Sequence, residues 1–362
     1  MPIFAPLRPL RRTTFPFTRS FAPRMLPVKR LALLSLLALS TTLAAAQKSA
    51  YSVQPLTLPQ ELADKNNQFS GLYRHGNQLL LLSESRLQER AEAKVYAVDL
   101  ASVDAQLRDK SVALRYRKYA IRGLEPLRAR MDSACQHYEG LEAITLVDNT
   151  VYLTVETTTP SAYGYLLRGA LDEGGGSITL EPKYLVPVPK PALTNGAHIS
   201  NAGFEALTSY NRDVLLLFEY NYFAHDNYAY RLPAGAATHD VPHFVPVARL
   251  PFRLTDLVYE GNNRFVGINY FYKGDDDSEY RTPAEDANTK LIQAGTGYKN
   301  YSRLIRLEYK KDRLTWKPLF ELPAEYQSYN LEGIAAYNGG YFLINDKYGP
   351  SNQSTLLYLQ KK

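Results

Sequence analysis

Acidic and hydroxyl side chains recur at one fixed spacing in this sequence, and side chains of these types can bind a cation. In five segments an anchor residue follows an apolar residue, and Leu or Ile stands two positions after the anchor. The anchors are Ser70, Glu142, Glu205, Thr255 and Glu332. Fourteen positions after them stand, in the same order, Glu84, Glu156, Glu219, Asn269 and Asp346. Seven of these ten residues are carboxylic acids, which suit an oxygen-ligated metal ion or general acid–base chemistry.

The spacing also indicates how the ten side chains come together. Turn-forming residues stand six and seven positions after the anchors, as in Gly76-Asn77, Asp148-Asn149 and Asn338-Gly339, and such pairs favour a tight β-hairpin. Both open ends of a hairpin lie at one level, opposite its turn. We therefore expect each anchor to lie beside the residue fourteen positions later. Five hairpins with the same internal spacing indicate a repeat protein.

Further strand-like segments follow each hairpin. The third strands are expected at 94–100, 163–171, 227–232, 302–309 and 354–360, and the fourth strands at 111–121, 177–188, 243–252 and 314–323. The fifth hairpin has no fourth strand after it, and residues 51–58 are expected to supply one. The prediction is an all-β fold, a five-bladed β-propeller of four-stranded antiparallel blades closed by the N-terminal strand of the mature chain. Six blades is the alternative. Short helices are expected at 60–65 and 124–132, and residues 47–362 should form a single domain.

A propeller would bring the ten residues to one mouth of its central channel, because the first strand of each blade lines that channel. Seven carboxylates there would repel one another and raise their own pKa values. A hard divalent cation would offset this repulsion, and an all-oxygen set without ordered His or Cys favours Ca²⁺ over zinc or copper. In the alternative, the acids are solvated or pair with Arg74, Arg86 or Lys347.

The first 46 residues have the composition of an export signal. Seven Lys and Arg precede the apolar run 31–43, and Ala44-Ala45-Ala46 provides small residues for cleavage after Ala46. The apolar run is short for a membrane span, so we expect a secreted or periplasmic protein without a span in the mature chain. Met25 is an alternative start.

The charge of the mature chain excludes a general nucleic-acid-binding protein. Of 42 Lys and Arg, seven belong to the leader, which leaves 35 against 36 Asp and Glu, a net charge of −1. The basic isoelectric point therefore belongs to the leader. Cys135 is the single cysteine, so neither a disulfide framework nor a cysteine metal site is expected.

Several segments resemble a known family. The segments 138–143, 201–207, 254–257 and 330–335 look like those of the secreted bacterial phytase-like family, also called "esterase-like activity of phytase". The order Ser, Glu, Glu, Thr, Glu of the anchors is also similar to that of the calcium-activated nucleotidase (apyrase) propellers, which have five blades and hold a central Ca²⁺.

The resemblance implies that the anchors bind Ca²⁺, directly or through water. The implied ligands are Ser70, Glu142, Glu205, Thr255 and Glu332. Two positions depart from the nucleotidases: Asn269 stands where an acid is expected, and the segment 83–86 matches their Asp-Asp-Arg only loosely. Metal binding could therefore exist without nucleotide hydrolysis.

Two functions remain open at this point. In the first, the protein is a secreted Ca²⁺-dependent hydrolase of a phosphate ester or anhydride, or of another ester, with Asp346 or Glu156 as the general base. Basic residues would bind its small anionic substrate, the candidates being Arg86, Arg128, Lys190 and Lys347. In the second, a structural Ca²⁺ joins the blades and the loops bind a ligand or partner without catalysis.

Residues 270–301 form either a lid or a solvated insertion, and a monomer is expected.

Overall fold

The computed structural model describes residues 50–84, 93–134, 137–158, 161–346 and 352–362. Residues 48–362 form one compact unit. The expected export signal lies outside the described residues. In the part of the chain that is described, no helix combines the length and apolarity that crossing a bilayer requires.

The strands form sheets whose order follows the chain. One sheet has eight strands, and its first four are β2 (Phe69–His75), β3 (Gln78–Ser83), β4 (Lys94–Asp99) and β5 (Tyr116–Arg122). The other four are β6 (Tyr138–Val147), β7 (Thr150–Thr157), β8 (Tyr163–Asp172) and β9 (Ser177–Pro189). Neighbours within each run of four are antiparallel. A short parallel pairing between β5 and β9, from Ala120–Ser177 to Arg122–Thr179, joins the two runs.

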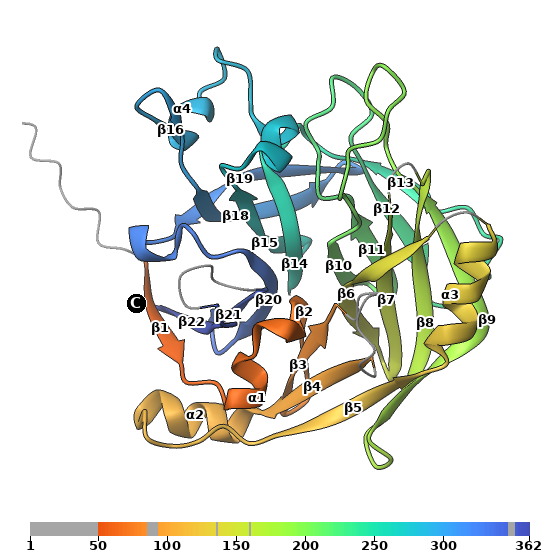
Figure 1. Ribbon diagram of the computed structural model, residues 1–362, viewed down its shortest axis with the longest axis vertical. Coiled ribbons are helices and arrows are strands. Elements are labelled where there is room, and N and C mark those ends of the chain that lie inside the picture. Colours follow the sequence, from red (N-terminus) through yellow and green to blue (C-terminus); the bar gives the residue numbers. More distant parts are fainter. Residues whose placement is uncertain (1–49, 85–92, 135–136, 159–160, 347–351) are drawn as a thin grey trace, which may run out of the picture. The chain divides into compact units, whose positions relative to one another are not determined.

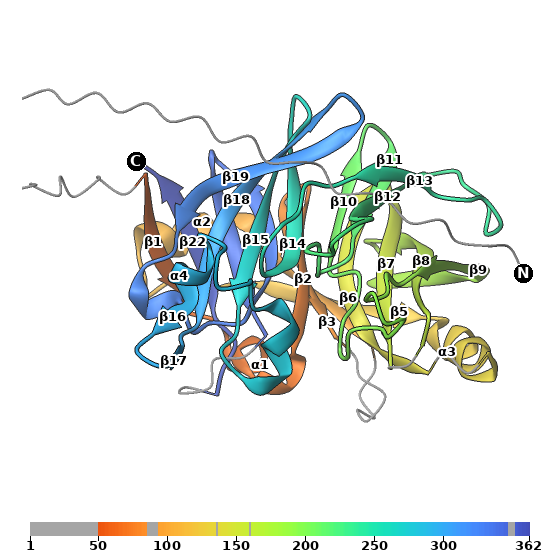
Figure 2. The same cartoon turned by 90° about the horizontal axis from the view of Figure 1, so that it is seen from above.

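Three further sheets have four strands each. The first contains β10 (Ala206–Tyr210), β11 (Asp213–Leu217), β12 (Tyr228–Pro233) and β13 (His243–Pro246). The second contains β14 (Arg253–Gly261), β15 (Arg264–Phe271), β18 (Tyr301–Lys310) and β19 (Arg313–Glu321). The third contains β20 (Leu331–Tyr337), β21 (Gly340–Asn345), β22 (Leu356–Lys361) and β1 (Tyr51–Leu56). The expected strand at the N-terminal end is confirmed, because β1 pairs with β22 along its whole length (Figure 2).

The first strands of these sheets surround a common centre. Strand β2 contacts β6, β6 contacts β10, β10 contacts β14, β14 contacts β20, and β20 returns to β2. The remaining strands of each run lie progressively further out (Figure 1). Sheets arranged radially around a closed ring of inner strands define a β-propeller. The all-β prediction is therefore confirmed at the level of a propeller.

The predicted hairpin turns occur where the sequence places them. The residue six positions after each anchor has a positive φ, from 46° at Asn338 to 88° at Gly261. Gly, Asn and Asp tolerate this left-handed conformation, and it matches the twist of the flanking strands. The turns thus fix the register that brings each anchor to the open end of its hairpin.

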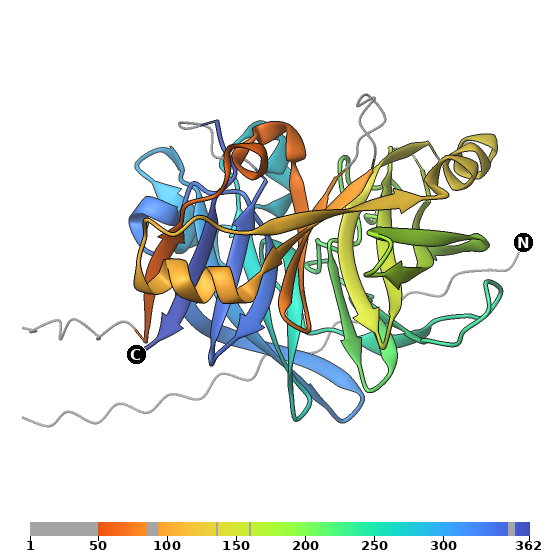
Figure 3. The ribbon, with the colours of Figure 1, turned by 90° about the horizontal axis from the view of Figure 1, so that it is seen from below.

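The helices agree with the sequence only in part. The expected helical segments appear as α1 (Gln60–Ala63) and α3 (Leu124–Ser133). Helix α2 (Leu100–Arg108) was not expected, and β5 begins five residues later than the predicted strand. The side chain of Asp99 accepts a hydrogen bond from Ala101 N at 3.1 Å and begins this helix. Helices α2 and α3 (gold) lie at opposite ends of β5 (Figure 3).

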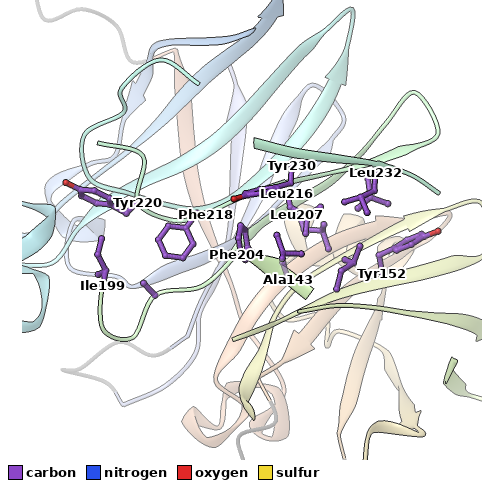
Figure 4. Close-up of a cluster of buried hydrophobic side chains, with 14 of the residues drawn as sticks. Ala143, Tyr152, Ile199, Phe204, Leu207, Leu216, Phe218, Tyr220, Tyr230 and Leu232 are labelled. Atoms are coloured by element: carbon purple, nitrogen blue, oxygen red, sulfur yellow. The ribbon is translucent and has the colours of Figure 1, made fainter. Parts of the chain in front are cut away.

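Short elements complete the described chain. They are the 3₁₀ turns η1 (Lys65–Asn67), η2 (Asp275–Tyr280) and η3 (Ala324–Tyr326), helix α4 (Thr289–Ile292), and strands β16 (Gln293–Ala294) and β17 (Gly297–Tyr298). Apolar side chains fill the space between neighbouring sheets. One such cluster joins Ala143 and Tyr152 to Phe204, Leu207 and Leu216 (Figure 4).

The carboxylate of Asp256 lies among the inner strands and binds several of them. It accepts hydrogen bonds from Leu257 N at 2.7 Å and from Ile334 N at 2.8 Å, and also from the backbone N–H groups of Leu72 and Leu207. These donors belong to β14, β20, β2 and β10, and each stands two positions after an anchor. Burial raises the pKa of Asp256, and the four N–H groups oppose that rise. One side chain therefore satisfies buried backbone donors from four inner strands.

Replacing Asp256 should destabilise the whole propeller. Asp256→Ala leaves four buried N–H groups without their acceptor, at about 1–3 kcal/mol for each, so we expect a loss of at least about 4 kcal/mol of unfolding free energy. Urea unfolding followed by far-UV circular dichroism measures this loss. The exposed Glu325 provides the control variant Glu325→Ala, which should unfold as the wild type does. Equal midpoints for the two variants would contradict a central role for Asp256.

Candidate functional site

A β-bulge aims the anchor side chains out of the regular ladder. In four hairpins the register shifts at the anchor itself, so that Ser70, Glu142, Thr255 and Glu332 are each the extra, unpaired residue. Glu205 directly precedes β10. A bulge re-aims a side chain and increases the local twist. The anchors therefore stand at the start of the inner strands, as their spacing predicts.

Six of the seven predicted carboxylates line one cavity of about 430 Å³. They are Glu84, Glu142, Glu156, Glu205, Glu332 and Asp346. We call this cavity the acid mouth. Glu219, the seventh, does not line the cavity and is fully buried. Asp277, Arg253, Tyr270 and Tyr272 also contribute to the lining.

The three positions without an acid make structural hydrogen bonds. Ser70 Oγ donates to Leu141 O at 2.6 Å, and Thr255 Oγ1 donates to Leu331 O at 2.6 Å. Each bond joins an inner strand to the next one in the ring. Asn269 donates its amide to Pro251 O at 2.7 Å and to Arg253 O at 2.9 Å. Asn269 thus positions the backbone of the residue that supplies positive charge to the mouth.

Arg253 is the residue that the spacing argument missed. Its guanidinium lies 3.0 Å from Glu219 Oε2, 2.9 Å from Asp277 Oδ1 and 3.9 Å from Glu205 Oε1. It also lies 4.5 Å from the ring centroid of Tyr280. The signal in the sequence is indirect. The hairpin that supplies Arg253 has Thr255 and Asn269 at the two positions where other hairpins have acids, so the one hairpin without mouth acids brings a cation.

The segment between β15 and β18 holds Arg253 in place. Asp277 and Tyr280 both belong to η2 in this segment, and Asp277 Oδ2 accepts a hydrogen bond from Tyr272 N at 3.1 Å. Asp277 and Tyr280 are buried. This part of the segment is therefore packed into the wall of the mouth and is not a solvated insertion.

Burial raises the pKa values of three of the mouth acids. Burial, and after it the negative charge of Glu219, raises the pKa of Glu156 to about 8, although the charge of Lys190 opposes the rise. The pKa of Glu205 is also raised, first by burial and then by Glu219, with Arg253 opposing. Burial and the neighbouring Asp346 and Glu84 raise the pKa of Glu332. The acid mouth consequently retains protons at pH values where exposed carboxyl groups have lost them.

Of the four candidate substrate-binding residues, the two that are described, Arg128 and Lys190, do not line the acid mouth. Arg128 on α3 is 3.0 Å from Glu125 and 4.1 Å from the ring centroid of Tyr138. Lys190 is 4% exposed, and its Nζ donates to Thr157 O at 2.6 Å. Burial lowers its pKa, and the charge of Glu156 opposes that. Arg86 and Lys347 lie outside the described residues.

Arg74 does not pair with the mouth acids. It lines a different cavity of about 190 Å³ with Leu72, Ser209, Tyr259 and other inner-strand residues, near the hairpin turns. Its guanidinium lies 5.8 Å from the ring centroid of Tyr337. The alternative in which Arg74 pairs with these acids does not hold, because Arg74 stands near the turn end of β2 while the acids stand at the other end.

The donor chemistry of the acid mouth fits a hard cation. Two buried carboxylate oxygens, Glu156 Oε1 and Glu205 Oε2, have no hydrogen-bond partner within the described chain. The titratable ligands are carboxylates, as Ca²⁺ prefers. However, no three His, Cys, Asp or Glu side chains in the described ranges are arranged so that they could hold a metal ion. The residues therefore fit a cation bound partly through water better than one ligated directly by three acids.

Comparisons with known proteins give a fold likeness. No protein-family model and no curated protein matches the sequence. A GH43_1 enzyme from Xanthomonas citri is 10% identical with a TM-score of 0.44, over 85% of this chain and 90% of that one. The Malassezia sympodialis allergen Mala s 1 is 10% identical with a TM-score of 0.43, over 84% and 97%. The soluble aldose sugar dehydrogenase of Escherichia coli is 9% identical with a TM-score of 0.42, over 86% and 100%. Likeness at this level says nothing about what this chain binds.

The metal-free protein should lose stability as the pH rises. The folded pKa of Glu156, about 8, exceeds its ordinary value of 4.5, so between these values the folded state binds more protons than the unfolded state. Its stabilising contribution is present at low pH and is lost as the pH rises through 8. In EGTA, we expect the melting temperature to fall by roughly 5–10 °C between pH 5 and pH 9. Glu156→Gln should flatten this profile, and Glu325→Gln should leave it unchanged. A melting temperature that rises over this range would contradict the assignment.

Removing the positive charge of Arg253 should lower the free energy of unfolding. Arg253→Met leaves Glu219 and Asp277 buried without that charge, and breaking a buried ion pair in this way costs about 3–5 kcal/mol. The matched control is Arg115→Met, since Arg115 pairs with Asp99 but is 72% exposed in its side chain, and exposed pairs contribute about 0–1 kcal/mol. Urea unfolding at pH 8 separates the two. Similar losses in both variants would show that Arg253 does not stabilise the mouth acids.

Proposed function

We propose that this protein is a five-bladed β-propeller of the phytase-like kind that hydrolyses a phosphate ester or anhydride, or another ester, with Ca²⁺ at its acid mouth. One observation carries the proposal. Six buried or half-buried carboxylates converge on a cavity of about 430 Å³, and the group at Glu156 has its pKa raised to about 8. Perturbed acids in a cleft are typical of functional sites.

The ring of inner strands supports the count of five blades. The contacts of β2, β6, β10, β14 and β20 close upon themselves, and each of these strands begins a run of four. The parallel pairing of β5 with β9 covers three residue pairs. We therefore interpret the eight-stranded sheet as two blades joined at their outer strands.

Glu142, Glu205 and Glu332 would hold the cation in part through water, with Ser70 and Thr255 contributing oxygen lone pairs. Both hydroxyl groups donate to backbone carbonyls, which leaves their oxygens able to accept or to ligate. When bound, Ca²⁺ would polarise an oxygen of the substrate and offset the repulsion of the acids.

Glu156 would serve as the general base. A carboxylate whose pKa lies near the working pH is the most effective proton acceptor, and Glu156 Oε1 has no hydrogen-bond partner among the described residues. Lys190, buried nearby, would help to set its charge state. Asp346 lines the same cavity and is the second candidate.

An anionic substrate is supported by a neighbouring cavity. A hollow of about 370 Å³ is lined by Lys273, Lys299 and one acid, Glu321, and shares Ser328 with the acid mouth. A substrate could place one group in the acid mouth and an anionic group beside these lysines. Arg86, Arg128, Lys190 and Lys347 remain the candidates from the sequence.

We further propose export of the chain, with cleavage after Ala46, and a monomeric mature protein.

The second candidate function is a binding propeller without catalysis. It is favoured by Arg253, which already neutralises part of the mouth charge and is engaged by Glu219 and Asp277. In this alternative, a bound cation would join blades and the neighbouring loops would bind a ligand.

The test combines thermal melts in EGTA and in Ca²⁺ with phosphate release from ATP, phytate and p-nitrophenyl phosphate. We expect Ca²⁺ to raise the melting temperature of the wild type but not that of the Glu205→Gln, Glu332→Gln double variant. Glu156→Gln should keep the Ca²⁺ response and lose about 10²–10⁴-fold in release. Glu325→Gln is the control.

The outcomes separate the two functions. A Ca²⁺-dependent melt without release from any of the three substrates would favour the binding propeller. A melt that is indifferent to Ca²⁺ would remove the proposed cation.

A further inference from the structure

Another cavity, of about 540 Å³, is lined by residues of the segments 191–194 and 220–230. We call it the aromatic pocket. Five aromatic side chains line it: Tyr220, Tyr222, Phe223, Tyr228 and Tyr230. The connections β9–β10 and β11–β12, which supply most of its residues, leave the sheets at the same end as the anchors, because β9 and β11 end there and β10 and β12 begin there. The pocket therefore lies at the end of the sheets that carries the acid mouth.

The wall contributed by the β11–β12 connection is fixed before any ligand arrives. The side chain of Asn227 accepts a hydrogen bond from Phe223 N at 3.0 Å and donates one to Phe223 O at 3.1 Å. Val247 N donates to Asn227 O at 2.7 Å, and Leu250 N donates to Asn221 O at 2.8 Å. These bonds fasten the connection to the chain between β13 and β14, so the aromatic rings need little ordering on binding.

The opposite wall is fixed as well. Leu193 N donates to Ala197 O at 2.8 Å, and Gly196 N donates to Leu193 O at 2.8 Å. Tyr230 joins the two walls, because its hydroxyl donates to Pro189 O at 2.9 Å. The rings of Tyr220 and Phe223 pack edge to face at 4.6 Å. Tyr220 and Tyr230 appear in Figure 4 at the edge of the buried cluster.

The charges around the pocket select the chemistry of its occupant. Apart from the tyrosines, the titratable lining residues are Asp226 and His225, both exposed, and no Lys or Arg of the described chain lines the pocket. An anion would therefore meet a carboxylate but no cation in the lining itself. The guanidinium of Arg249 lies 4.0 Å from the ring centroid of Tyr222, so an organic cation would meet a like charge on the aromatic face that should attract it.

A neutral ring with hydroxyl groups fits all of these features. Its apolar C–H faces can lie against the aromatic rings, and its hydroxyls can bond to Asp226, His225 and the tyrosine hydroxyls at the rim. Asp226 already accepts a hydrogen bond from the Tyr228 hydroxyl at 3.0 Å, which orients its carboxylate. We propose that the aromatic pocket binds a sugar ring of a neutral glycan.

This proposal does not depend on the hydrolase or on Ca²⁺. The two sites are neighbours, however. The ring centroids of Tyr220 in the pocket and Tyr280 lie 5.4 Å apart. The guanidinium of Arg253 in the acid mouth lies over the same Tyr280 ring. A glycan held in the pocket would consequently extend over the face on which the acid mouth opens.

Calorimetric titration of the mature protein in EGTA tests the proposal, because the chelator removes any binding of sugar hydroxyls through a metal. The probes are cellotetraose, maltotetraose and chitotetraose, with choline as the cationic comparison. At least one tetrasaccharide should bind. Tyr222→Ala and Tyr228→Ala should each weaken that binding about tenfold. Both residues are half-buried, and a melt of each variant verifies its fold.

Asp226→Ala changes an exposed side chain and should also weaken binding of the tetrasaccharide. The matched control is Tyr163→Ala, an aromatic residue on β8 that is 39% exposed and outside the pocket, and it should bind as the wild type does. The proposal is overturned if no tetrasaccharide binds, if choline binds in their place, or if the pocket variants bind as tightly as Tyr163→Ala.

Discussion

The structure depends on satisfying backbone donors where the inner strands converge. Two residues after four of the anchors, backbone N–H groups of the inner strands meet at the centre, and a buried donor without an acceptor costs about 1–3 kcal/mol. Asp256 accepts such bonds from four inner strands at once. A carboxylate is suited to this position because it has two oxygens and no hydrogen to donate. Bulges at Glu142 and Glu332 release these two residues from the ladder, so the inner strands that converge at the centre also supply side chains to the acid mouth.

The acid mouth shows how a protein can bury carboxylates whose mutual repulsion is unfavourable. Part of the repulsion is relieved by protonation, as the raised pKa values of Glu156, Glu205 and Glu332 indicate. Another part is relieved by Arg253, which contacts Glu219 and Asp277. Arginine suits this role because its planar fork serves two carboxylates while its face packs on Tyr280. Such a site costs stability, and natural proteins keep that cost mainly where it serves a function.

The sequence predicted the parts of this structure that repeat. Fixed spacing located the hairpins, the turns at Gly76 and Asn338, and the gathering of six acids, because period and turn chemistry are local properties. It missed α2, because the side chain of Asp99 caps a helix in front of a segment that looks like a strand. It also missed Arg253 and Asp256. Arg253 stands two positions before the anchor Thr255 and Asp256 directly after it, and each occurs in one hairpin alone. A repeat argument compares copies, so it cannot reveal a residue that acts at the shared centre once.

The segment between β15 and β18 links the acid mouth to the aromatic pocket through Tyr280. Packing alone does not couple two sites, since coupling requires an element with two arrangements that both ligands bias. Arg253 is the candidate for that element. Under the proposed function, a cation at the mouth would compete with its guanidinium for Glu205. Only an Arg253 that also left Glu219 would no longer hold Asp277 and the ring of Tyr280. Tyr220 packs on that ring, so the wall of the pocket would follow. The two sites are therefore independent as long as Arg253 stays paired, and they become linked only if a cation displaces it.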